Sequence, residues 1–247
     1  MANQFDPRIA YPRATVGAEV GDTSFDAGLR SYMLSVYNYM ASGVLLTGVV
    51  ALFFARGGRE SIAAQIFMQP GPMKWVVLLA PIALVMVLSF GINKLSETSA
   101  KAIFWLYAAL MGASLSTVLL VYTGASVAST FFATAASFAA LSLYGYTTKR
   151  DLSGMGKFLM MGVVGLLVAM VINMFTQSGT MSLIISMIGV LLFAGLTVYD
   201  TQKIKQMYYQ VQGSDFVGKS VIMGALTLYL DFINLFLFLL RFMGDRR

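Results

Sequence analysis

Two aspartates stand inside otherwise apolar segments of this sequence. Of its eleven acidic residues, only Asp200 and Asp231 lie within or at the end of an uncharged apolar run; the others lie in tails, loops or at segment ends. If these runs cross a membrane, an ionised group costs at least ~2.5–3.5 kcal/mol, so it normally faces a bundle interior or a water-filled cavity. The sequence contains no Cys and no His. Carboxylates are therefore the groups that would titrate or bind a cation at such a site.

Each aspartate belongs to a stripe of polar or small residues on an apolar helix. Steps of three and four residues keep side chains on one helical face at about 3.6 residues per turn. The two stripes are Ser220, Gly224, Thr227, Asp231 and Asn234, and Ser182, Ser186, Gly189, Phe193, Thr197 and Asp200. We expect both stripes to face a polar interior, with Asn234, Thr197 and Thr227 as candidate pore or cation contacts.

No Lys or Arg lies within the apolar runs to neutralise a buried Asp231. Its remaining options are to be protonated, to share a proton with another carboxyl, or to bind a cation. Two purely structural alternatives stay open. Asp200 precedes Lys203 by one turn and could form an interfacial ion pair, and Asp231 could be a neutral acid that hydrogen-bonds a backbone carbonyl.

The composition places these residues in a membrane protein. The chain is 58% hydrophobic and 11% charged, against about 25% charged residues in soluble domains. The alternation typical of a membrane β-barrel strand is absent, so the fold class is an all-α integral membrane protein. Charge-free runs predict seven spanning helices, namely 31–55, 75–93, two within 102–148 that divide near Gly124, two within 158–199 that divide near Gly179, and 217–241.

The flanking segments complete the domain organisation. Residues 1–30 are predicted to be a polar, flexible tail, 31–244 the seven-helix transmembrane domain, and 245–247 a short C-terminal tail. Small residues within 128–142 and the glycines of 154–165 predict close helix packing. The net charge of +6 does not indicate nucleic-acid binding, because the basic residues stand singly between apolar runs.

The distribution of Lys and Arg predicts a cytoplasmic N-terminus. With seven spans and the N-terminus inside, the inner side holds eleven basic residues and the outer side six, as the positive-inside rule requires. This arrangement places the basic C-terminus outside. A re-entrant last segment would bring that end back inside and change the distribution to fourteen against three, so the path of this segment stays open.

Four segments of the sequence resemble a known family. They are "AGLTVYDTQKIKQMYY" (194–209), "LTLYLDFINLFLFLLRFMG" (226–244), "FWLYAALMGASLS" (104–116) and "LYGYTTKRDLSGMG" (143–156). Together they resemble the bacterial branch of the Bax inhibitor-1 family, the transmembrane Bax-inhibitor-motif proteins, over about residues 30–244.

The resemblance implies six helices around a central seventh, in the bacterial inner membrane, and a pH-sensitive Ca²⁺ leak. It also implies that Asp200 and Asp231 share a proton and act as the pH sensor and gate. Some bacterial relatives carry an acidic residue and a clamping arginine in the second helix, whereas 75–93 here is uncharged. Lys94 and Lys203 are therefore the candidate counter-charges.

Two classes of function follow as expectations. The first is a cation pathway for Ca²⁺ and H⁺, with Asp200 and Asp231 as transient oxygen ligands and no bound cofactor, because hard cations prefer oxygen and tight binding would stop conduction. The second is a membrane stress regulator that binds other membrane proteins. An enzyme is not indicated, since nucleotide loops, zinc motifs and nucleophile–base pairs are missing.

Overall fold

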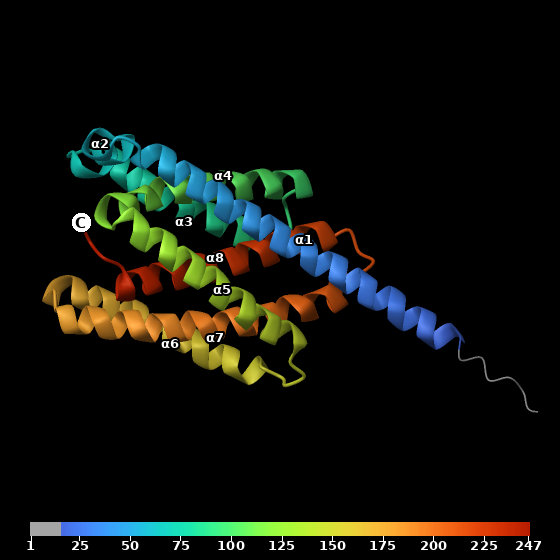
Figure 1. Ribbon diagram of the computed structural model, residues 1–247. Helices are drawn as coiled ribbons and strands as arrows, with labels where there is room; N and C mark the ends of the chain where they lie inside the picture. The colour runs from blue at the N-terminus through green and yellow to red at the C-terminus, as the bar shows by residue number, and fades with distance from the viewer. Residues whose placement is uncertain (1–15) are drawn as a thin grey trace, which may run out of the picture.

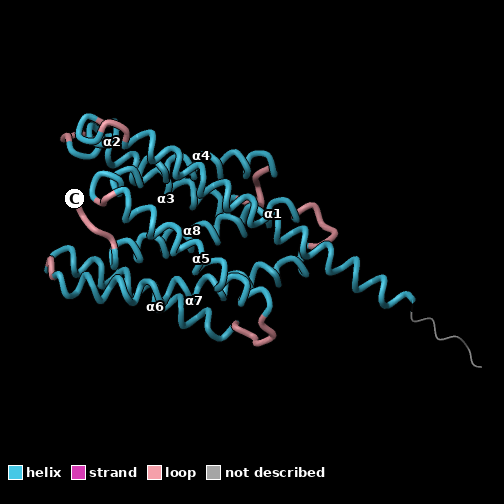
Figure 2. Tube along the Cα trace, in the orientation of Figure 1, coloured by secondary structure: helices cyan, strands magenta, loops and turns pink. Residues whose placement is uncertain are grey.

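The computed structural model describes residues 16–247, which form helices joined by short loops (Figure 2). The elements are α1 (Val16–Ala55), the 3₁₀ helix η1 (Gly58–Glu60), α2 (Ile62–Met68), α3 (Met73–Gly91), α4 (Glu97–Val121), α5 (Gly124–Thr147), α6 (Ser153–Thr176), α7 (Gly179–Val211) and α8 (Val217–Met243). Seven of the described helices are long and apolar enough to cross a membrane. The predicted seven-helix membrane fold is confirmed.

Both predicted divisions of the long apolar runs occur at capped turns. The Thr123 side chain accepts a hydrogen bond from the Ser126 backbone N–H and begins α5. Likewise, the Ser178 side chain accepts from the Met181 N–H at the start of α7, after Gln177 ends α6 in a left-handed conformation. Such caps satisfy backbone groups that helix ends leave unpaired, so the chain can turn at the membrane boundary.

The first part of the chain differs from the predicted boundaries. α1 begins at Val16, well before the predicted start at residue 31, and the part of it that could span a membrane is 27–55. The rest of the predicted tail, residues 1–15, lies outside the described residues. The short helix α2 was not predicted, because Ile62–Met68 lacks the length that identifies a span. The Ser61 side chain caps it by accepting from the Ala64 N–H.

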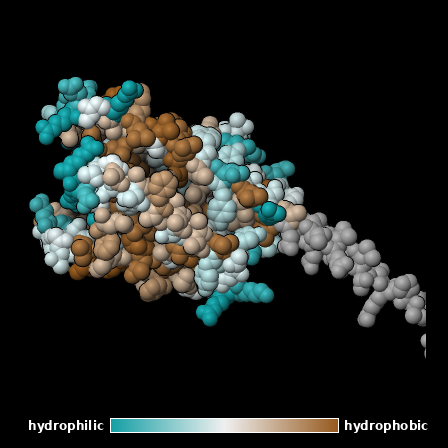
Figure 3. Space-filling model, in the orientation of Figure 1, coloured by the Kyte–Doolittle hydropathy of each residue, from teal (hydrophilic) through white to brown (hydrophobic). Residues whose placement is uncertain are grey.

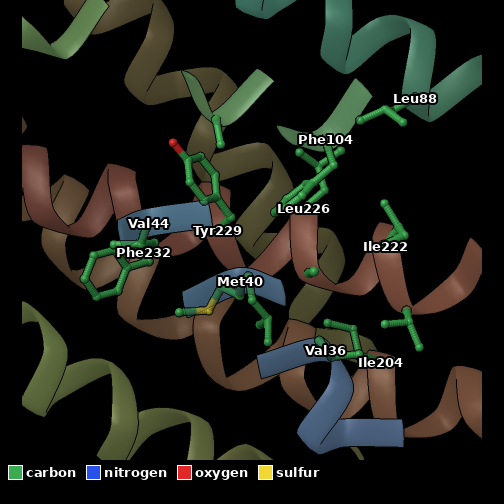
Figure 4. Close-up of a cluster of buried hydrophobic side chains, with 14 of the residues drawn as sticks. Val36, Met40, Val44, Leu88, Phe104, Ile204, Ile222, Leu226, Tyr229 and Phe232 are labelled. Atoms are coloured by element: carbon green, nitrogen blue, oxygen red, sulfur yellow. The ribbon is translucent and has the colours of Figure 1, made fainter. Parts of the chain in front are cut away.

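α8 is the central helix of the bundle, as the family resemblance implied. In Figure 1 it lies between α1 and α4 on one side and α7 on the other, with α5 across it. Figure 4 shows side chains of α1, α3, α4 and α7 gathered with those of α8 in one buried cluster. Apolar residues on several faces of α8 are buried, including Leu228 and Leu235. The apolar flanks of α8 therefore pack against protein, and not against lipid as one inward stripe suggests.

The outer helices supply the surface that faces lipid. Side chains of α6 such as Phe158, Met161 and Phe175 are 70–77% exposed, and Figure 3 shows an apolar belt between polar ends. Exposed apolar side chains of this size are costly in water and favourable in a bilayer.

The last segment crosses the bundle and does not re-enter. α8 runs unbroken from Val217 to Met243, and the tail that follows is bonded to the α4–α5 loop. The Thr123 N–H donates to the Asp245 carbonyl at 3.0 Å, and the Arg247 N–H donates to the Val121 carbonyl at 2.9 Å. The C-terminus is thus at the end opposite to the α7–α8 loop.

Small residues allow several of the close helix contacts. Gly156 and Gly162 of α6 face Tyr199 and Leu192 of α7, which agrees with the packing interpretation of these glycines. At Gly145 of α5, an added Cβ would collide with the backbone carbonyl of Val198 on α7.

We expect Gly145→Ala to destabilise the protein by about 1–3 kcal/mol, because backbone cannot move aside as a flexible side chain can. Thermal unfolding in detergent measures this effect. Gly165→Ala on α6 is the matched control, since nothing lies within 4 Å of the added methyl, and it should keep or raise stability. If the two variants changed the Tm equally, α5 and α7 would not be in close contact at Gly145.

Candidate functional site: a carboxyl pair between α7 and α8

The two sequence-predicted aspartates come together in the interior of the bundle. Asp200 of α7 is 8% exposed and Asp231 of α8 is 4% exposed. Their side chains lie within reach of a shared hydrogen bond. α7 and α8 pack side by side along their length (Figure 1), so the pair joins the central helix to the helix with which it has the most extensive contact.

One oxygen of the pair has no partner within the described part of the chain. The Oδ2 atom of Asp231 is buried and makes no hydrogen bond there. A buried polar atom without a partner costs about 1–3 kcal/mol and more when charged. The position therefore favours a proton or a small cation at this carboxyl, since either one would satisfy the oxygen.

The three candidate contact residues lie on the same two helices as the pair. Thr197 donates to the Phe193 carbonyl at 2.8 Å, Thr227 to Met223 at 3.0 Å, and Asn234 to Leu230 at 2.8 Å. Each donor is thus used within its own helix. Their oxygen atoms remain as possible acceptor groups, and a role in cation contact stays a prediction.

The two candidate counter-charges differ in their relation to the pair. Lys203 acts electrostatically on Asp200 from one turn further along α7. Among the side chains of residues 27–247, the one ion pair within 4.0 Å joins Lys101 to Glu97 at 2.5 Å, so Lys203 does not bridge Asp200 directly. Lys94 lies in the turn after α3 with an exposed side chain, and no contact with the aspartates brings it into the site.

A chain of hydroxyl groups next to Asp200 was not predicted. The Tyr37 hydroxyl hydrogen-bonds Ser142 at 2.5 Å, and Ser142 hydrogen-bonds Thr201 at 2.8 Å. Tyr37 and Ser142 line a cavity of about 490 Å³ between α1 and α5. Thr201 follows Asp200 in the "YDTQ" segment, so its position next to a candidate residue could have identified it. Tyr37 stands in an apolar run with no such signal.

The last residue of "YDTQ" fastens a loop. Gln202 donates from Nε2 to the Arg150 carbonyl at 2.7 Å and accepts at Oε1 from the Leu152 N–H at 2.9 Å. Lys205 adds a bond from Nζ to the Tyr146 carbonyl at 2.9 Å. These contacts tie the α5–α6 connection to the part of α7 that carries Asp200.

The comparison with known families agrees with these motifs. Residues 29–247 match the family described as Inhibitor of apoptosis-promoting Bax1. The chain belongs to this Bax inhibitor family. This match confirms the family that the four sequence segments indicated.

Bacterial relatives match over nearly their whole length. An uncharacterized protein of Rickettsia prowazekii is 48% identical over 225 residues, which are 91% of this chain and 93% of the relative. A protein of Caulobacter vibrioides is 44% identical over 251 residues, covering 96% and 97%. The inner membrane protein YbhL of Escherichia coli is 47% identical over 223 residues, covering 90% and 94%.

The donor set of this Bax inhibitor family member limits what the site can hold. Within the described residues, no group of three or more acidic side chains is placed to bind a metal ion. Ca²⁺ normally takes six to eight oxygen ligands. Two carboxyls and nearby carbonyls therefore suit brief contact with a passing cation better than tight binding.

Proposed function

We propose that the protein is a pH-sensitive cation leak, with Ca²⁺ as the transported ion, gated by Asp200 and Asp231. The observation that carries this proposal is the meeting of two buried carboxyls from α7 and α8. Two carboxylates in contact cannot both ionise easily, so the number of protons on the pair changes with pH. The charge between the two helices then changes as well.

The pair can work as a latch for the central helix. A single shared proton makes a short, charge-assisted hydrogen bond. Loss of this proton leaves two anions that repel, and a second proton weakens the bond. Because α8 packs against α1, α5 and α7, a change at Asp231 alters the contacts of the central helix. The deprotonated pair is also the better cation site.

The second candidate function, a regulator that binds other membrane proteins, has less support. Its sequence support was the faces rich in small residues together with the N-terminal tail, of which residues 1–15 lie outside the described residues. In the structure, Gly145, Gly156 and Gly162 contact α7 of the same chain, so these positions are occupied by internal packing.

Flux through reconstituted liposomes tests the proposal. Purified protein should release entrapped Ca²⁺ at a rate that depends on pH between about pH 5 and pH 8. Parallel measurements with Na⁺ and H⁺ establish the selectivity. Release no faster than from protein-free liposomes at every pH would reject the leak and favour the regulator.

We expect the N-terminus to lie in the cytoplasm, because of the eleven-to-six excess of basic residues. Single-cysteine labelling is clean, since the chain has no Cys. Ser153→Cys and Ser214→Cys should resist an impermeant thiol reagent added to intact cells, whereas Gln177→Cys should react. If Ser153→Cys is labelled in intact cells, the predicted orientation is wrong and the N-terminus lies outside.

A further inference from the structure

A polar cavity lies at the end of the bundle where α8 finishes. It has a volume of about 280 Å³ and is lined by Asn173 of α6, Ser182 of α7, and Arg241 and Arg246 at the end of α8. The α6–α7 hairpin and the C-terminal tail lie at the same end of the bundle (Figure 1), and residues of both line the cavity. It is at the opposite end of α8 from the α7–α8 loop and separate from the carboxyl pair.

The polar groups around this cavity are hydrogen-bond donors. Asn173 uses its Oδ1 to accept from the Ser178 N–H at 3.1 Å and from Thr176 at 3.3 Å, which leaves the amide N–H groups for a ligand. The Ser182 hydroxyl makes no hydrogen bond with any described residue. No acidic residue lines the cavity. A set of donors without a carboxylate recognises an anion.

The two arginines lack acidic partners among the side chains of residues 27–247. The only ion pair there is the one between Lys101 and Glu97. Asp245 stands beside Arg246 in the sequence, but its carboxylate accepts from the Ser126 hydroxyl at 3.3 Å. The Arg246 guanidinium also lies 5.8 Å from the centre of the Tyr122 ring, which is a contact with an uncharged group. Arg241 also favours the negative end of the α8 dipole, but that role does not require a cavity of donors.

The apolar wall of the cavity identifies the source of the anion. Met170, Met174 and Ile185 complete the lining. Met174 is 65% exposed and the adjacent Phe175 is 77% exposed, so this side opens to the lipid-facing surface of α6. The cavity lies at the end of the spans, which is the depth of the headgroups. A headgroup phosphate with acyl chains along α6 fits both the donors and the apolar wall.

We propose that this cavity binds the phosphate of an anionic phospholipid and thereby clamps the α6–α7 hairpin to the end of α8. Arginine guanidinium groups bind phosphate through paired N–H donors. The bound lipid would hold the α6–α7 hairpin to the end of α8, far from the carboxyl pair that joins α7 to α8 in the interior. This inference does not depend on ion conduction.

Thermal unfolding in lipid nanodiscs tests the assignment. The probe is phosphatidylglycerol mixed into phosphatidylcholine, and native mass spectrometry counts the lipids retained. The anionic lipid should raise the Tm of the wild type by about 5–10 °C. Arg241→Gln should reduce the affinity for the anionic lipid by about tenfold. This variant should also lose most of the Tm gain. Arg241→Lys should restore part of this gain.

Two further variants separate the cavity from general surface charge. Ser182→Val removes a donor and fills space without a charge change, and should also reduce the Tm gain. Arg56→Gln with Arg59→Gln removes two exposed arginines from the α1–α2 connection. This connection lies at the same end of the bundle as the C-terminus (Figure 1), and the double variant should leave the gain intact. The proposal would be overturned if this control lost the Tm gain as Arg241→Gln does. It would also be overturned if the wild type had the same Tm with and without phosphatidylglycerol.

Inorganic phosphate added to pure phosphatidylcholine nanodiscs distinguishes the two sources of the anion. It should not reproduce the Tm gain, because it lacks acyl chains for the apolar wall. If phosphate alone gives the full gain, the ligand is the free anion and the lipid assignment is wrong.

Discussion

Replacing Asp231 with asparagine is expected to abolish the pH dependence of Ca²⁺ flux while the protein still folds and inserts. Asparagine has nearly the same size and keeps hydrogen-bonding groups beside Asp200, but it cannot ionise. It also removes the cost of a charge at a site that is 4% exposed. The ratio of flux at about pH 5 to flux at about pH 8 should approach about 1, because the pair no longer exists to gain or lose protons together.

The matched control is Asp215→Asn, which removes a carboxylate from the exposed α7–α8 loop. This variant should keep the full pH response, and its size-exclusion profile and Tm should match those of the wild type. A preserved pH response in Asp231→Asn, with Asp215→Asn unchanged, would place the sensor elsewhere in the protein. Asp231 would then be an acid retained for packing.

A double-mutant cycle on Asp200 and Asp231 should reveal strong coupling between them. The single variants Asp200→Asn and Asp231→Asn each break the contact between the carboxyls. The change in stability of the double variant should therefore be smaller than the sum of the changes in the two single variants. We expect an interaction energy of about 0.5–3 kcal/mol in thermal stability, with a parallel interaction in flux. The interaction energy should vary between about pH 5 and about pH 8, because a shared proton stabilises the contact in only one protonation state of the pair.

A second cycle, on Asp200 and Asp215, supplies the reference for additivity. The exposed Asp215 does not share the interior site, so its interaction energy with Asp200 should be within about 0.5 kcal/mol of zero. If the effects of substituting Asp200 and Asp231 are also additive at every pH, the two acids do not act as one unit and the proposed latch is wrong. Retained flux with altered coupling would still support a leak and would reject only the gate.

Much of the fold is determined locally, and the sequence indicates it. A chain in lipid must satisfy its backbone groups within each span, so long uncharged runs become helices. The turns near Gly124 and Gly179 were predicted because a run of twice the needed length must divide, and the caps Thr123 and Ser178 do divide it. The two aspartates were found because a carboxyl in an apolar helix is costly.

Other polar groups of the structure depend on which helices are neighbours. Tyr37, Ser142 and Thr201 come from three helices and form one hydroxyl chain only after α1, α5 and α7 pack. The cavity with Arg241 and Arg246 likewise needs the α6–α7 hairpin beside the end of α8. No spacing along the chain indicates either group, since each joins residues that are far apart in sequence.

The sequence by itself determined the seven spans, the family and the two carboxyls that belong in an interior. The family resemblance implied a central last helix, but the composition of the segments did not distinguish it: only the tertiary structure shows apolar faces of α8 buried against protein and those of α6 exposed. The physical reason is that lipid tails are as apolar as a protein core, so leucine and phenylalanine suit both surroundings. The polar side chains, the close contact at Gly145 and the bonded C-terminal tail therefore select the partners of each helix.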